Sequence, residues 1–298
     1  MTAFPLPRDL RGYGEHPPDV RWPGGARIAV SLVVNIEDGA ERSVARGDVA
    51  DDLGAHWLRH RAFPGQRDLD LESAFEYGAR SGIWRVLRTL RRHGARATAF
   101  CCASALQANP SIAHALVRDR HEIADHGLDW DTHSALAPEV EADLMQRSRR
   151  IIEEITGVRP TTWYSRDGLT LHSRDAMIDE GFRYDSNSFD DDLPHDGADG
   201  LPLLVIPYAG DTNDSALLSQ YPTAASFSSF LCSALEMLGS EARPGPAVLS
   251  VGLHPRIIGR PAYIAALDTF LTRVAESGAW IATRQEIADA WLSETAGG

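Results

Sequence analysis

Short apolar runs alternate along the chain with segments whose apolar residues recur at helical spacing. Two of the helical segments, residues 72–94 and 137–157, each end at a glycine, which is a common stop signal for helices. The runs that predict strands are residues 26–35, 96–102, 121–126, 159–165, 182–188, 203–208, 247–254 and 279–283. Roughly eight strand–helix units, with no Pro-, Gly- or Ser-rich linker between them, predict a single (β/α) barrel of the α/β class. A doubly wound open sheet is the alternative.

We expect one catalytic domain over residues 1–298, because no linker divides the chain. Residues 1–25 form an N-terminal extension before the first predicted strand. Residues 41–70 form a long loop between that strand and the first helix. This loop is a candidate lid or subunit contact.

Composition narrows the classes of partner. A formal net charge of -13 disfavours nucleic acid and anionic membrane surfaces, because both require a basic protein surface. Residues 1–20 lack the apolar core of a signal peptide, and no window of about 18 apolar residues could span a membrane. The cysteines Cys101, Cys102 and Cys232 cannot all pair with one another. We therefore expect a soluble, cytoplasmic protein without nucleic-acid or membrane partners.

Polar and ionisable residues stand where nearly every predicted strand ends. In (β/α) barrels the chemistry takes place at this end, where strands pass into loops. The residues are Glu37 and Asp38 after the first strand, His126 and Trp130 after the third, Tyr164, Ser165, Arg166 and Asp167 near the end of the fourth, Asp211 and Asp214 after the sixth, and His254 at the end of the seventh. This recurrence predicts an active site at the strand ends, with the stretch NIEDGAE (35–41) as one wall.

Each of these residues also has a simpler structural interpretation. Glu37 and Asp38 could lie in a solvated turn, and either histidine could be a core residue bonded to the backbone. Asp211 and Asp214 could stabilise Asx turns. The run before Glu37 is too apolar for a solvated edge, however. Two neighbouring carboxylates can differ in pKa, and imidazole is the usual proton donor near neutral pH, so the whole set suits acid–base catalysis.

Three of these segments resemble motifs of the polysaccharide deacetylases (carbohydrate esterase family 4 type). NIEDG stands where that family has Thr-Phe-Asp-Asp-Gly, HGLDW where it has His-x-x-x-His, and SVGLH where it has Leu-x-x-His. The resemblance implies that Glu37 is the catalytic base and His254 the catalytic acid. It also implies that Asp38 and His126 are the remaining metal ligands. We count Asp38 with the catalytic residues as well. Trp130 takes the place of the second histidine ligand, and an indole does not coordinate a divalent ion. We therefore expect no metal; the alternative is Zn²⁺ held by Asp38 and His126.

Over nearly its whole length the chain is more similar to the allantoinase and cyclic imide hydrolase branch of that superfamily. The stretches ESAFEYGARSGIWR, RHEIADHGLDW and VGLHPRIIGRPAYIAAL carry this resemblance. The branch implies a distorted (β/α) barrel, a homotetramer, no cofactor, and metal-independent opening of small rings. The stretch WYSRDG differs from the Trp-Tyr-Thr-Gly-Arg-Thr of its allantoinases, because Arg166 comes one position earlier and Asp167 takes the arginine position. This stretch is more similar to the imide hydrolases.

The resemblance thus implies a hydrolase that acts on a non-peptide C–N bond and opens a small cyclic imide or ureide. One alternative is a metal-dependent N-deacetylase of acetylated oligosaccharides, and another is an inactive protein that binds small molecules. For the ring-opening enzyme we expect Glu37 to activate water, with a pKa raised by burial and by Asp38. His254 then protonates the departing nitrogen.

Five further residues are predicted to bind the substrate. Arg166 is expected to grip a carbonyl or carboxylate, because its planar guanidinium suits paired oxygens. Trp130 is expected to stack on the substrate ring. The other three are His126, Tyr164 and Asp211.

Overall fold

Strand β1 (Ile28–Ile36) is buried at every position and lies at the centre of the architecture. The computed structural model describes residues 8–54, 63–197, 200–208, 210–216, 223–240 and 245–295. Along one edge β1 pairs in parallel with β8 (Ala247–Leu253). Its other edge is shared, because its first half pairs with β9 (Trp280–Ala282) and its second half with β2 (Thr98–Cys101). A strand with both edges paired and both faces covered is mostly apolar, which explains a run that only Ser31 and Asn35 interrupt.

The sheet continues from β2 through shorter parallel strands. Its order is β6-β7-β5-β4-β3-β2-β1-β8. The added strands are β3 (Glu122–Asp125), β4 (Thr162–Trp163), β5 (Tyr184–Asp185), β6 (His195–Asp196) and β7 (Leu204–Val205). All pairs are parallel except β6 with β7. The sheet curls into a half-barrel, and an isolated bridge between Asn213 and Gly252 connects the segment after β7 back to β8.

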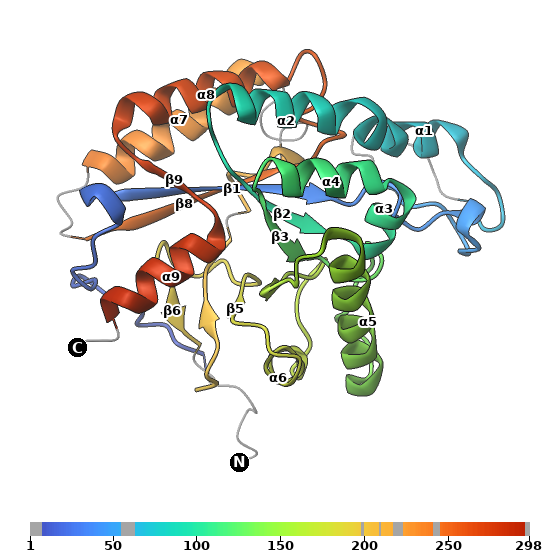
Figure 1. Ribbon diagram of the computed structural model, residues 1–298, viewed down its shortest axis with the longest axis horizontal. Helices are drawn as coiled ribbons and strands as arrows, with labels where there is room; N and C mark the ends of the chain where they lie inside the picture. The colour runs from blue at the N-terminus through green and yellow to red at the C-terminus, as the bar shows by residue number, and fades with distance from the viewer. Residues whose placement is uncertain are drawn as a thin grey trace.

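Helices cover the sheet on both sides (Figure 1). In that view α2 (Ile83–Arg92), α7 (Ala224–Ser240) and α8 (Ile264–Ser277) lie along one side of β1 and β8. On the opposite side lie α5 (Pro138–Thr156), α6 (Ser173–Asp179) and α9 (Arg284–Thr295). The remaining helical elements are α1 (Leu69–Tyr77), α3 (Ala103–Ala108), α4 (Pro110–Arg118), a π-helical turn η3 (Gly78–Gly82), and the short 3₁₀ turns η1 (Pro23–Gly25), η2 (Val44–Arg46) and η4 (Asp214–Ala216). The largest apolar core cluster joins β1 and β8 to α2, α7 and α8.

Most of the predicted elements are confirmed. Each of the eight predicted strands overlaps an observed strand. The predicted helix 137–157 is α5, followed by Gly157 in the left-handed conformation that favours glycine. The predicted helix 72–94 is a continuous helical segment of three parts, because a π-helical turn interrupts it between α1 and α2.

The expected regular alternation of strands and helices is wrong in one region. Between β5 and β7 the described residues contain β6, an antiparallel strand, in place of a helix. The observed strands β4, β5 and β7 are two residues long. The predicted runs 159–165, 182–188 and 203–208 therefore extend beyond these strands on both sides. The fold is therefore the expected distorted barrel with a curled, partly open sheet.

The predicted N-terminal extension packs onto the barrel. Residues 1–7 lie outside the described residues. Trp22 is fully buried, and its indole N–H donates to the carbonyl oxygen of Ala247 at 3.1 Å. Of the predicted loop 41–70, residues 55–62 lie outside the described residues, and α1 already begins at Leu69.

Two further expectations concern cysteines and membranes. Cys101, Cys102 and Cys232 are all free thiols. Across the described ranges, no helix combines the length and apolar character needed to cross a membrane.

Candidate active site

Three predicted residues meet at the ends of β1, β3 and β8. The Glu37 carboxylate oxygen Oε1 lies 3.2 Å from His126 Nε2 and 3.5 Å from His254 Nε2. Because parallel strands end at the same edge of a sheet, residues that are distant in sequence converge there. Only 2% of Glu37, 3% of His126 and 7% of His254 is exposed. The structure therefore brings these three predicted residues into one cluster, and their roles stay predictions.

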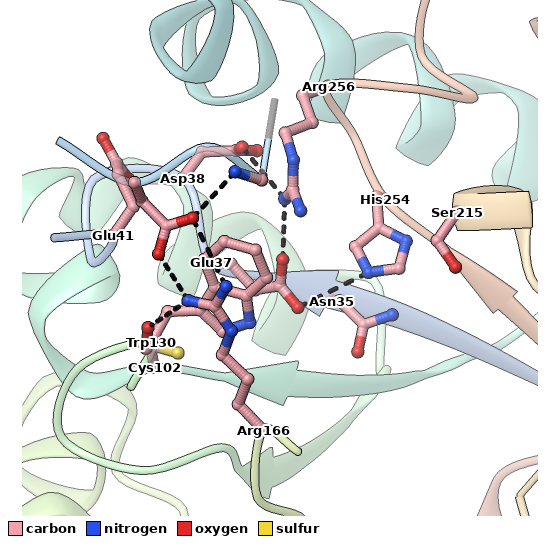
Figure 2. Close-up of polar contacts among 12 residues, drawn as sticks. Asn35, Glu37, Asp38, Glu41, Cys102, Trp130, Arg166, Ser215, His254 and Arg256 are labelled. Carbon is pink, nitrogen blue, oxygen red and sulfur yellow. Dashed lines mark hydrogen bonds and ion pairs between the residues drawn. The ribbon is translucent and has the colours of Figure 1, made fainter. Parts of the chain in front are cut away.

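The cluster contains a cation that the sequence analysis missed. Arg256 Nη1 donates to Glu37 Oε2 at 2.6 Å and lies 3.4 Å from Asp38 Oδ1. The Arg256 side chain is completely buried. Figure 2 shows its guanidinium and the His254 imidazole both pointing toward Glu37. The sequence signal was the run LHPR, in which Arg256 follows His254 by two residues.

Asp214 sets the orientation of His254. Its Oδ1 accepts a hydrogen bond from His254 Nδ1 at 2.6 Å, which leaves Nε2 facing Glu37. The other oxygen, Oδ2, accepts from the backbone N–H groups of His254 at 2.7 Å and Ile258 at 3.2 Å. Asp214 thus holds both the ring and the loop after β8. The Asx-turn interpretation of this residue is replaced by a direct contact with the proposed acid.

His126 is oriented in a similar way by the chain after β4. Its Nδ1 donates to the carbonyl oxygen of Tyr164 at 2.7 Å, so Nε2 faces Glu37. The Tyr164 ring stacks on Phe100, with centroids 5.0 Å apart, and also contacts the edge of Tyr208. Tyr164 therefore positions His126 through its backbone, while its ring belongs to an aromatic cluster.

The predicted direction of the Glu37 pKa is wrong. Burial raises the pKa of this carboxyl, but the positive charges of His254 and Arg256 and the contact with His126 outweigh burial and hold it well below its usual value. The sequence analysis included the burial but not the cations. Glu37 is therefore ionised at neutral pH.

The neighbouring groups shift in the opposite direction. Burial raises the pKa of Asp38 to about 7, and Glu37 and Glu41 add to this effect, although Arg256 opposes it. Burial lowers the pKa of His254, but the charges of Glu37 and Asp214 outweigh burial and raise it to about 9. At neutral pH the site thus holds an anionic Glu37 beside a protonated His254.

Asp38 is packed directly against the π-helical turn. A Cβ atom on Gly78 would lie 1.9 Å from Asp38 Oδ2, and one on Gly82 would lie 2.0 Å from the carbonyl oxygen of Pro255. Only glycine leaves this space for the loops that carry Asp38 and Arg256. π-Helical turns are frequent at functional sites, and this one sets how closely α1 and α2 approach both loops.

Trp130 and Arg166 are engaged with each other. The Arg166 guanidinium lies over the Trp130 ring at 3.7 Å from its centroid. Its Nη1 and Nη2 donate to the two oxygens of Asp52 at 2.5 and 3.3 Å, and Nη1 also donates to the Trp130 carbonyl oxygen at 3.0 Å. In this structure Arg166 is therefore not free to grip a substrate. Stacking of a substrate ring on this face of Trp130 stays a prediction that would require Arg166 to move.

Asp211 lies apart from the cluster. It is exposed, and its Oδ1 accepts from the backbone N–H of Thr212 at 3.0 Å. The described contacts do not join it to Glu37 or His254. Its role in substrate binding stays a prediction, and its observed contact is that of a turn residue.

The residues present do not fit a metal ion. Within the described ranges, no group of three or more His, Cys, Asp or Glu side chains could hold one. Trp130 supplies no ligand atom, and the Arg256 guanidinium already lies against Glu37 and Asp38. A cation placed between these carboxylates would meet the charge of Arg256 at short range.

Comparisons with known proteins point to one family. A sequence profile of the family described as polysaccharide deacetylase matches residues 69–180. A protein of Schizosaccharomyces pombe, described as a polysaccharide deacetylase, is 30% identical over 311 residues, covering 96% of this chain and 97% of the relative.

Two solved structures are similar over nearly their whole length. A protein of Pseudomonas aeruginosa PAO1, described as a polysaccharide deacetylase, is 40% identical with a TM-score of 0.92, covering 97% of this chain and 99% of the other. A structure described as Puue allantoinase is 37% identical with a TM-score of 0.91, covering 97% of this chain and 98% of the other. The motifs at the strand ends, the curled half-barrel and these full-length similarities lead to one conclusion. The chain belongs to the polysaccharide deacetylase family and is a hydrolase of that superfamily.

Proposed function

We propose that this protein hydrolyses a non-peptide C–N bond and opens a small cyclic imide or ureide. The observation that carries the proposal is the pairing of an ionised Glu37 with a protonated His254, whose facing atoms lie 3.5 Å apart. Such a pair supplies the proton acceptor and the proton donor that amide hydrolysis needs. The similarity to a structure described as an allantoinase supports the same class of substrate.

The reaction follows from the positions of these groups. Glu37 accepts a proton from water as the water oxygen attacks the substrate carbonyl carbon. The C–N bond then breaks, and His254 Nε2 delivers its proton to the nitrogen, which is too basic to leave as an anion. Asp214 stabilises the imidazolium before this transfer and keeps Nε2 pointed at the reacting atoms.

The low pKa of Glu37 favours an activated substrate. A weakly basic carboxylate makes water a modest nucleophile, so the carbonyl carbon must itself be electrophilic. An imide carbonyl is more electrophilic than the acetamide of an acetylated sugar. The charge distribution of the site therefore supports ring opening over sugar deacetylation.

We further propose that the reaction needs no metal and that the protein is a homotetramer. The poor fit of a metal to the cluster supports the first proposal. The resemblance to the allantoinase branch supports the second, and light scattering that gives the mass of one chain would exclude it.

A substrate panel tests the function. Purified protein is assayed with allantoin, hydantoin, a dihydropyrimidine, succinimide, maleimide and an acetylated chitooligosaccharide, each with and without a chelator. We expect ring opening of at least one cyclic compound, unchanged by the chelator. Release of acetate without any ring opening would support the deacetylase, and activity restored only by zinc would contradict metal independence. Absence of turnover with every compound would favour a binding protein.

A further inference from the structure

We propose that Arg256 binds the oxygen of the attacked carbonyl group and stabilises the negative charge that develops on it. This inference rests on the proposed function, because it concerns the same site. It assigns to Arg256 the role that the sequence analysis gave to Arg166. The argument depends on unsatisfied hydrogen-bond donors, on the rigidity of the loop, and on the contacts of the two arginines.

Arg256 has donors that lack partners. A guanidinium has five N–H groups, distributed over three nitrogens. Nη1 contacts Glu37 and Asp38, whereas Nε and Nη2 are buried and have no hydrogen-bond partner among the described residues. The Phe75 and Trp130 rings lie near the guanidinium, 5.1 and 4.7 Å from its central carbon, but rings are weak acceptors. A buried, unpaired donor is costly and calls for an explanation, and a substrate oxygen supplies one.

The loop that carries Arg256 is held rigidly. Asp214 bonds the backbone N–H groups on both sides of it, at His254 and Ile258. The π-helical turn packs against it so closely that Gly82 has no room for a Cβ beside Pro255. Donors that are fixed before the reaction stabilise developing charge without reorganisation. Arg256 meets this requirement because both its loop and its Nη1 are anchored.

The other arginine at the strand ends is less suited to the role. Arg166 donates to both oxygens of Asp52 and to the Trp130 carbonyl oxygen. It would have to break these bonds before it could reach a substrate. Arg256 already contacts the base, Glu37, whose other oxygen faces the acid, His254, so its guanidinium lies beside the proton-transfer pair.

The chemical step is balanced without any further reactant. Water forms a C–O bond to the carbonyl carbon and gives one proton to Glu37, while the carbonyl π electrons move onto the oxygen that Arg256 holds. When the oxyanion collapses, the C=O bond re-forms and the C–N bond breaks. The nitrogen receives its proton from His254. The products are a carboxyl group and the primary amide of an opened imide or the ureido group of an opened ureide.

Arg256→Lys and Arg256→Ala test the inference in the ring-opening assay. Removal of one oxyanion donor typically lowers kcat by about 10²–10³-fold. We expect a loss of that size in Arg256→Lys, with a smaller change in KM, because lysine keeps the charge but carries its donors on one nitrogen, which cannot contact Glu37 and the substrate oxygen as the planar guanidinium does. Added guanidinium chloride should partly restore Arg256→Ala, since it fits the space left by the side chain.

Arg284→Lys is the matched control, because Arg284 is equally buried and all its nitrogens are bonded inside the barrel. We expect this variant to lower Tm while keeping kcat. Equal kcat in wild type and Arg256→Lys would overturn the inference. A loss in Arg256→Ala that guanidinium does not restore, and that Arg284→Lys shares, would overturn it as well.

A binding measurement separates this inference from the proposed function. Succinamate, the ring-opened product of succinimide, is titrated into wild type and Arg256→Ala by calorimetry. We expect Kd to rise at least about tenfold in the variant, because one charge-assisted contact is lost. If wild type opens no ring but this difference remains, the proposed function fails and the role of Arg256 in binding oxygen stands. Equal binding by both proteins would overturn that role.

Discussion

Two fully buried arginines show how the strand ends differ from the barrel interior. In the interior, Arg284 donates from Nε to Ser186 Oγ at 2.9 Å, from Nη1 to Ser250 Oγ at 3.0 Å, and from Nη2 to the Pro207 carbonyl oxygen at 2.9 Å. At the strand ends, Arg256 uses only Nη1 for the described hydrogen bonds.

The charges around the two arginines differ as well. Burial lowers the pKa of Arg284, whose hydrogen bonds go to hydroxyl and carbonyl groups. Burial also lowers the pKa of Arg256, but Glu37 and Asp38 outweigh it and raise the pKa. A buried cation whose nitrogens are all hydrogen-bonded inside the protein belongs to the fold, whereas one with unpaired nitrogens and carboxylate partners is arranged for a ligand. Variants at the strand ends should therefore change the rate, and variants in the interior should change stability.

The largest effect is expected from the two groups that transfer protons. Glu37→Gln removes the acceptor and His254→Ala the donor, and each should lower kcat by about 10²–10⁴-fold. Steady-state kinetics on the best substrate of the panel measures this loss. Circular dichroism and Tm should show that both variants remain folded. Full activity in Glu37→Gln would mean that the strand-end carboxylate is not the base.

A smaller effect, visible in the pH profile, is expected from Asp214→Asn. Asp214 helps raise the pKa of His254 to about 9, so wild-type kcat/KM should fall as the pH rises through about 9 and His254 loses its proton. Without the charge of Asp214, the alkaline limb of the kcat/KM profile should shift to lower pH by about one to three units, the usual effect of one nearby opposite charge. The protonation of His254 also contributes to the free energy of unfolding. This contribution is fully present below pH 6.5 and is lost as the pH rises through about 9.

Asp211→Asn is the matched control for the pH profile. Asp211 is also an acid in the segment after β7, but it is exposed and has no described contact with His254. Its substitution should leave the alkaline limb in place. An unchanged limb in Asp214→Asn would contradict the assignment of that limb to His254.

Gly78→Ala tests whether packing alone can disturb the strand ends. The added methyl group would overlap Asp38 and should lower the free energy of unfolding by about 1–3 kcal/mol, with a several-fold lower kcat. Denaturant unfolding and kinetics measure the two effects. Gly239→Ala is the control, because its methyl group would only reach ordinary contact with Ile28 at 3.6 Å. Equal stability of the two variants would show that the close contact at Gly78 is unimportant.

The smallest effect is expected at the Arg166–Asp52 ion pair. Arg166→Ala and Asp52→Ala should each raise KM several-fold, because the chain after β1 would no longer be bonded to the loop after β4. The double variant should resemble either single variant, since both remove the same interaction. Additive effects on KM would show that the residues act separately, and Arg166 could then contact the substrate itself.

Much of the site could be predicted because local pattern and topology agree. Glu37 and His126 each stand at the end of a predicted strand, and parallel strands place their carboxyl ends together, so the prediction that they meet needed no side-chain detail. The predicted pKa of Glu37 failed because that value depends on which cations lie within a few ångströms. Arg166 and Arg256 both follow a strand end, and local sequence does not distinguish the one that reaches Glu37.

The sequence by itself determined the buried strands, the ionisable residues at their ends and the family resemblance. These follow from hydrophobic periodicity and from short motifs, which are local properties of the chain. Only the tertiary structure decided that Arg256 contacts Glu37, that Asp214 orients His254, and that Arg166 is held by Asp52. The path of each loop decides these pairings, and that path depends on contacts such as those at Gly78 and Gly82 between segments far apart in sequence. Electrostatic energies vary steeply over a few ångströms, so they become defined only when the chain is folded.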